Sequence, residues 1–131
     1  MRILTQIKEI TDIVKACNTN KLLAEQSYNT STYRFQYNNR AAPENYDQPL
    51  IDYLEKLPPP VIGYLVSLVC IGRDRLKITN ANDFKNYHED VMSAGGFRKR
   101  PEECKRYLRD RAMNLDQFFS KSKKYAVYIN T

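Results

Sequence analysis

The sequence has little of what most catalytic sites and metal centres require. It contains one histidine, His88, and three cysteines, none of them in a Cys-x-x-Cys pair. Structural zinc takes four Cys or His ligands, often in close pairs, and the four such residues here are scattered over almost the whole chain. Neither of the glycine-rich phosphate-binding motifs, Gly-x-x-x-x-Gly-Lys-Ser/Thr and Gly-x-Gly-x-x-Gly, occurs. We therefore expect no metal, no cofactor and no enzymatic activity.

The few residues of these types have simpler interpretations. His88 falls on a predicted helix and lacks a Gly-x-Ser-x-Gly elbow, so a surface or capping role is favoured over a catalytic triad. An odd number of widely spaced cysteines argues against a disulfide framework and indicates reduced thiols in the cytoplasm. Cys17 and Cys70 stand among apolar neighbours and are predicted to be small buried side chains.

Long hydrophobic runs are also missing. The longest, Tyr64 to Ile71, is interrupted by Ser67 and is far shorter than the ~20 residues that cross a bilayer. Lys8 and Glu9 come too early for a signal peptide. An apolar content of 42% in 131 residues is typical of a globular chain. We expect one soluble, cytoplasmic domain over 1–131, with no membrane contact.

The charge is distributed unevenly. Up to Gly95, eleven basic residues are balanced by eleven acidic ones, whereas from Gly96 onward ten basic residues face only four acidic ones. The whole net charge of +6 therefore lies in a basic C-terminal quarter, residues 96–124. Such an asymmetry attracts anionic partners. A solvated helix face that only aids solubility is the alternative interpretation.

Apolar spacing predicts an all-α fold, a compact bundle of about six or seven short helices. Residues 61–72 are apolar on all sides, which predicts a central core helix that the others surround. It follows three prolines, which end the preceding helix, and Gly72 is interpreted as its terminator. Apolar residues at spacings of three and four predict a first helix over 2–17, which Asn18 to Asn20 end before a short second helix.

A polar, Tyr- and Asn-rich segment spans residues 27–48 and has no helical periodicity. Within it, 32–37 alternates in the manner of a strand, and 125–129 is also β-prone. A single strand cannot satisfy its own backbone, so the two segments are predicted to pair as a small two-stranded ribbon.

The candidate binding surface is the basic stretch that follows Gly95 and Gly96. Lys105 and Arg109 are four residues apart and share one face of a predicted helix, with three more cations beside its start. Cations on one face can contact phosphates and release counterions. We expect the surplus cations to converge into one exposed surface. The predicted partner-binding residues are Arg98, Lys99, Arg100, Lys105, Arg106 and Arg109.

A secondary surface is predicted at Tyr33, Arg34 and Tyr37, with Arg73 as a further member. Exposed tyrosines make good anchors for a protein partner. Aromatic side chains beside Arg34 could also stack on nucleotide bases. Packing of the predicted ribbon onto the helices is favoured over that stacking role.

Two blocks carry a resemblance to a known family. The first is Leu50-Ile51-Asp52-Tyr53-Leu54 followed by the core-helix run Tyr64-Leu65-Val66-Ser67-Leu68-Val69-Cys70-Ile71-Gly72-Arg73. The second is Tyr107-Leu108 followed by Leu115 and Phe118. Over about residues 50–119 the chain resembles an uncharacterised bacterial domain-of-unknown-function family of small helical proteins. The resemblance implies a helical fold and no particular activity. It leaves Arg73 either as a shared surface contact or as a lock on the end of the core helix.

Two functions follow from these patterns. The first is a non-catalytic intracellular binding module whose basic C-terminal region docks an acidic partner, either nucleic acid or a nucleic-acid-handling protein. The second is a protein-directed adaptor or inhibitor, such as a small bacterial or phage-encoded regulator that blocks a larger enzyme. The second function would use the Tyr-rich stretch 28–46 as its surface.

Overall fold

The computed structural model describes residues 2–30 and 47–129, and every regular element in those ranges is helical. The predicted all-α class is therefore confirmed. In chain order the elements are α1 (Arg2–Thr30), α4 (Gln48–Glu55), α5 (Pro59–Asp74), α6 (Ala81–Ala94), α7 (Glu102–Asp110), the 3₁₀ helix η1 (Ala112–Asn114), α8 (Leu115–Ser122) and the 3₁₀ helix η2 (Lys123–Tyr128).

Helix α5 is the centre of the bundle, as its apolar sequence predicts. Ten of the eleven residues from Ile62 to Gly72 are buried, so this part of the helix has no solvated face. Two prolines occupy its first turn, where the missing amide donors cost nothing. The helix continues two residues past Gly72 and ends at Arg75, which has the left-handed conformation.

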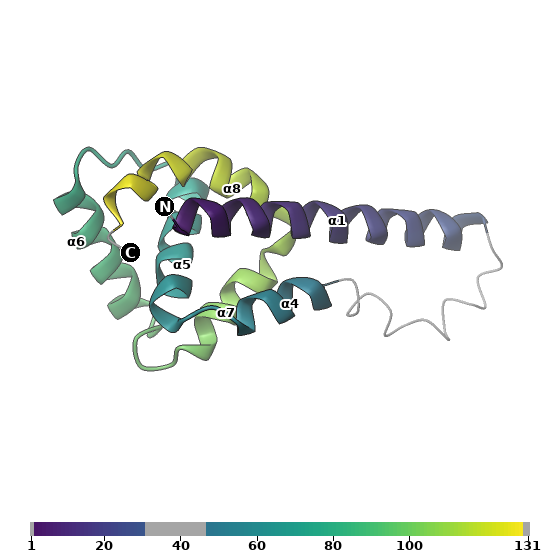
Figure 1. Cartoon of the computed structure of the whole chain (residues 1–131), viewed down its shortest axis with the longest axis horizontal. Coiled ribbons are helices and arrows are strands. Elements are labelled where there is room, and N and C mark those ends of the chain that lie inside the picture. Colours follow the sequence, from purple (N-terminus) through teal and green to yellow (C-terminus); the bar gives the residue numbers. More distant parts are fainter. Residues whose placement is uncertain (1, 31–46, 130–131) are drawn as a thin grey trace.

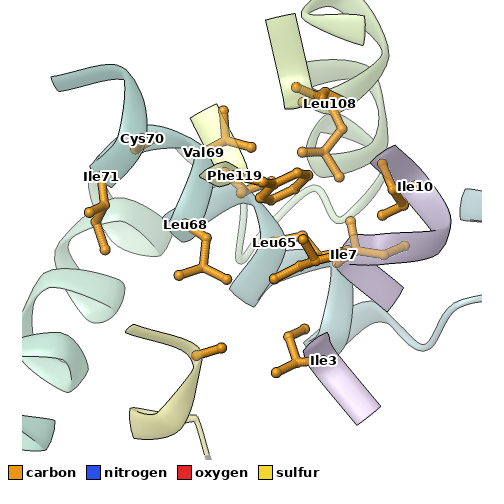
Figure 2. Close-up of a cluster of buried hydrophobic side chains, with 14 of the residues drawn as sticks. Ile3, Ile7, Ile10, Leu65, Leu68, Val69, Cys70, Ile71, Leu108 and Phe119 are labelled. Carbon is orange, nitrogen blue, oxygen red and sulfur yellow. The ribbon is translucent and has the colours of Figure 1, made fainter. Parts of the chain in front are cut away.

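The other helices each contribute apolar side chains to one core around α5. Helix α1 contributes Ile3, Ile7 and Ile10, which lie on one face at spacings of four and three. Phe119 of α8 reaches the middle of this cluster, and Leu108 of α7 covers its upper side in Figure 2. One buried cluster includes side chains from all the helices of the described part of the chain.

A close approach of backbones joins α5 to α8. A Cβ atom added at Gly72 would lie 2.1 Å from the carbonyl oxygen of Phe118, a distance that real Cβ atoms do not show. Glycine at this position therefore allows the two helices to touch through their backbones. The prediction that Gly72 terminates the core helix was wrong, because the residue lies inside α5 and serves packing.

The predicted break near Asn20 was also wrong. Helix α1 is continuous over Arg2–Thr30, and in Figure 1 its second half projects beyond the rest of the bundle. Asparagine lowers helix propensity only modestly, and extending an existing helix adds one hydrogen bond per residue. Asn18 instead uses its side-chain amide to donate a hydrogen bond to the carbonyl oxygen of Met113 (3.4 Å). Leu22 and Leu23 are exposed on the projecting part.

The predicted ribbon does not form, because residues 125–129 are not a strand. Lys123–Tyr128 form η2, in which the adjacent side chains of Tyr125 and Ala126 are both buried. A strand would point neighbouring side chains to opposite faces, so burial of both favours a helical turn. The other half of the ribbon, 32–37, lies outside the described residues.

Within the described ranges 2–30 and 47–129, no helix is both long enough and apolar enough to cross a membrane. All three cysteines are buried, as predicted for Cys17 and Cys70.

Replacing Gly72 by alanine tests the close contact between α5 and α8. The added methyl group would force the two helices apart, and we expect a loss of ~3 kcal/mol in the free energy of unfolding, measured by urea titration with circular dichroism. Gly63→Ala is the matched control in the same helix, since its Cβ would lie 3.2 Å from the flexible Met92 sulfur and at an ordinary contact distance of 3.7 Å from the His88 ring. A Gly72→Ala protein as stable as the Gly63→Ala protein would contradict this packing.

Candidate functional site

The predicted basic stretch begins with an ordered loop between α6 and α7, which holds residues 98–100. The other predicted cations, Lys105, Arg106 and Arg109, lie on α7 itself. The backbone amide of Arg98 donates to the carbonyl of Met92, and that of Arg100 donates to the carbonyl of Gly96. Gly96 has a φ of 71°, a conformation that glycine adopts without strain. Phe97 anchors the loop because its ring packs edge-on against Tyr107, with 5.6 Å between ring centroids.

Three of the six predicted binding cations are held in ion pairs. Arg98 contacts Glu89 at 2.6 Å, Lys105 contacts Glu55 at 3.2 Å and Glu102 at 3.5 Å, and Arg106 contacts Asp110 at 3.9 Å. Exposed pairs of this kind contribute only about 0–1 kcal/mol to stability. Their carboxylates nevertheless cancel much of the positive potential around these three side chains.

The other three predicted cations, Lys99, Arg100 and Arg109, are exposed and form no ion pair with any residue in the described ranges. Lys105 and Arg109, which were predicted to share one helix face, line a cavity of about 230 Å³ between α4 and α7, and Arg106 lines it too. Three carboxylates line the same cavity, namely Glu55, Glu102 and Glu103. The cavity is therefore mixed in charge.

The surplus cations do not converge on one surface. In Figure 1 the loop between α6 and α7 lies at the lower edge of the molecule, whereas α8 and η2 lie at the upper edge. The loop that holds residues 98–100 is thus separated from α8 and η2, which hold residues 121–124, by the body of the bundle. The basic C-terminal quarter is divided between two surfaces.

Sequence reasoning missed a second group of cations. Arg75 and Lys77, just after α5, line a cavity of about 860 Å³ together with Lys121 and Lys124. We call this cavity, between residues 71–78 and 120–125, the basic groove. A signal for it was present in the sequence, since 121–124 holds three lysines and 73–77 holds three cations. Nothing in the sequence placed these two segments side by side.

Arg73 locks the end of α5, which was one of the two roles left open by the sequence. Its guanidinium binds both carboxylate oxygens of Asp74 (2.9 and 3.0 Å) and donates to the Tyr107 hydroxyl at 2.8 Å. The hydrogen bond with Arg73 lowers the pKa of the Asp74 carboxyl. The Arg111 guanidinium lies over the Tyr107 ring, 3.6 Å from its centroid. These contacts hold α5 against α7.

Tyr107 stays protonated in this cluster. Burial, and then the hydrogen bond between its hydroxyl and the Cys70 thiol (3.2 Å), raise the pKa of Tyr107 to about 12. The neutral phenol can therefore accept from Arg73 over the whole physiological range of pH. The other members of the predicted secondary surface, Tyr33, Arg34 and Tyr37, lie outside the described residues.

His88 is not a surface or capping residue, contrary to the sequence-based expectation. Its Nδ1 atom is 2.6 Å from the hydroxyl oxygen of Ser67, a fully buried side chain of α5. Its ring stacks on Tyr64, with 4.4 Å between centroids. The imidazole thus satisfies the one hydroxyl group that interrupts the apolar run of the core helix. Ser67 is too deeply buried to serve as a nucleophile.

No cluster of three or more His, Cys, Asp or Glu residues suited to a metal ion exists among residues 2–30 and 47–129. In comparisons with known proteins, no family model matches the chain, and neither does any curated protein or solved structure. The resemblance of residues 50–119 to a bacterial family stays a prediction. The assignment of function must rest on the site itself.

The burial of His88 predicts a pH dependence of stability. Burial lowers the pKa of His88 from its ordinary value of 6.5, while Glu89 raises it and Arg98 lowers it. The unfolded chain therefore binds a proton more readily than the folded chain, so the stability that neutral His88 contributes is present above pH 6.5 and is lost as pH falls through its folded pKa.

We expect the free energy of unfolding to fall as the pH decreases below 6.5 in the wild type, and to fall much less in His88→Gln. Urea titrations at several pH values measure both. His88 is the one histidine of the chain, so no second imidazole contributes in this window. Equal pH slopes in the two proteins would rule out this role.

Proposed function

We propose that this protein is a non-catalytic, cytoplasmic module that binds nucleic acid through the basic C-terminal quarter. One observation carries the proposal. Six exposed cations of this quarter form no ion pair with any described residue: Lys99, Arg100, Arg109, Lys121, Lys123 and Lys124. Their charges are available to an anionic partner.

Phosphate is the anion that suits these side chains best. Lysines supply four of the six charges, and a lysine ammonium acts as a compact point charge that does not require the planar geometry of a carboxylate. Duplex DNA presents one negative charge per about 1.7 Å of its axis, so the cations on either of the two surfaces can each meet a phosphate. Such contacts release counterions and give affinity without sequence preference.

The protein-directed alternative has no such support. Its proposed surface lies mainly in 31–46, outside the described residues. Within the described part, Tyr107 and Tyr125 use their rings or hydroxyl groups in contacts inside the protein. We therefore retain nucleic acid as the proposed partner.

Fluorescence anisotropy with the full chain tests this proposal. The probes are mixed-sequence duplex and single-stranded DNA and RNA, titrated over a series of salt concentrations, with polyglutamate as a competing polyanion. We expect the logarithm of the association constant to fall linearly with the logarithm of salt concentration, with a slope of about −0.9 for each duplex phosphate contacted.

Two outcomes count against the proposal. One is the absence of binding to every nucleic acid at low ionic strength, and the other is an affinity that does not change with salt. Polyglutamate that binds more tightly than the nucleic acids would transfer the assignment to an acidic protein partner.

A further inference from the structure

The basic groove has cations on both of its sides. Arg75 and Lys77 come from the segment after α5, and Lys121 and Lys124 come from α8 and η2. No carboxylate from the described part of the chain lines the groove, and none of the four cations is in an ion pair there. This contrasts with the cavity between α4 and α7, where three carboxylates face three cations.

The groove is held in shape by tyrosine side chains. The Tyr125 hydroxyl donates to the carbonyl of Leu76 (3.4 Å), and the Tyr128 hydroxyl donates to the carbonyl of Thr79 (3.3 Å). The buried side chains of Ile71, Ile78 and Tyr125 line its inner side. The segment 76–79 is thereby fixed to η2 before any ligand arrives, which reduces the entropy that binding would cost.

Arg75 occupies a position where glycine is the favoured residue. Its φ and ψ angles are 55° and 42°, the left-handed region that side chains with a Cβ atom disfavour. It is the only described residue other than glycine with a positive φ. Conformational strain of this kind concentrates at functional sites, and here it places a guanidinium on the rim of the basic groove.

We propose that the basic groove is the nucleic-acid site and that it binds the sugar-phosphate backbone, with Arg75, Lys77, Lys121 and Lys124 contacting phosphates. This inference rests on the proposed function. The one aromatic ring that lines the groove, Tyr125, is buried and is not available to stack on bases. Recognition is therefore of the phosphate backbone and independent of sequence, and duplex binds at least as well as single strand.

The test compares two triple variants that each lose three exposed lysines. The groove variant carries Lys77→Ala, Lys121→Ala and Lys124→Ala. Binding to a mixed-sequence DNA duplex is measured by fluorescence anisotropy over a salt series. We expect the groove variant to bind on the order of tenfold more weakly at moderate salt, and its salt slope to be shallower by about one for each lysine that contacts a phosphate.

The control variant carries Lys15→Ala, Lys56→Ala and Lys85→Ala, three exposed lysines outside the groove. It has the same net charge as the groove variant, so the two differ only in where the charge is lost. We expect its affinity and salt slope to stay close to those of the wild type. Equal losses of affinity in both variants would show that binding follows net charge. That result would overturn the assignment of the groove as the binding site and would leave nucleic-acid binding itself in place.

A third variant, Lys99→Ala, Arg100→Ala and Arg109→Ala, shows which of the two basic surfaces is the site. If it loses binding while the groove variant keeps it, the loop between α6 and α7 is the site and the inference is overturned. If the wild type binds no nucleic acid at all, the proposed function itself fails. The two failures are therefore distinguishable.

Arg75→Gly separates binding from folding. Glycine fits the left-handed conformation, so this variant should melt at the wild-type temperature or higher. We expect its affinity for the duplex to fall severalfold nonetheless. Unchanged affinity would remove Arg75 from the site, and amide chemical shifts of residues 75–78 and 120–125 that do not move on adding duplex would overturn the groove.

Discussion

The contact between the backbones of α5 and α8 is the constraint on which the rest of the molecule depends. Gly72 and Phe118 approach so closely that no side chain fits between them. This contact brings the end of the core helix next to α8, and the connection that follows α5 must then pass along η2. The same contact therefore shapes both the core and the basic groove. Because Gly72 lets α5 approach α8, Arg75 just after α5 and Lys121 of α8 line the same groove.

Hydrogen bonds of tyrosine hydroxyl groups fix the connecting segments and helix ends to neighbouring helices. Tyr107 ties Arg73 and Cys70 to α7, while Tyr125 and Tyr128 hold the carbonyls of Leu76 and Thr79. Each ring packs on the apolar core and each hydroxyl reaches a polar group at its edge, which suits the two-sided chemistry of tyrosine. Segments without regular structure are thereby fixed in place, and lysines beside them remain exposed.

The sequence located the surplus of positive charge but not its surface. Counting residues could not show that Lys105 meets Glu55, fifty positions away, or that Arg98 meets Glu89. These pairs form because packing of α4 on α7, and of the loop after α6, brings the side chains together. Two further cations without an ion pair to a described residue, Arg75 and Lys77, lie in the segment just after α5. The sequence therefore predicted the sign of the charge, whereas none of the four cations that line the basic groove is among the six residues predicted to bind a partner.

The sequence by itself determined the helical class, the central place of α5 and the stripe Ile3, Ile7, Ile10 and Val14, because burial periodicity is a local property of the chain. Only the tertiary structure decided that Tyr125 and Ala126 form a helical turn, that Gly72 is a packing residue and that His88 turns inward to Ser67. Each of these depends on partners far away in the sequence, and no local pattern encodes which distant surface a side chain will meet.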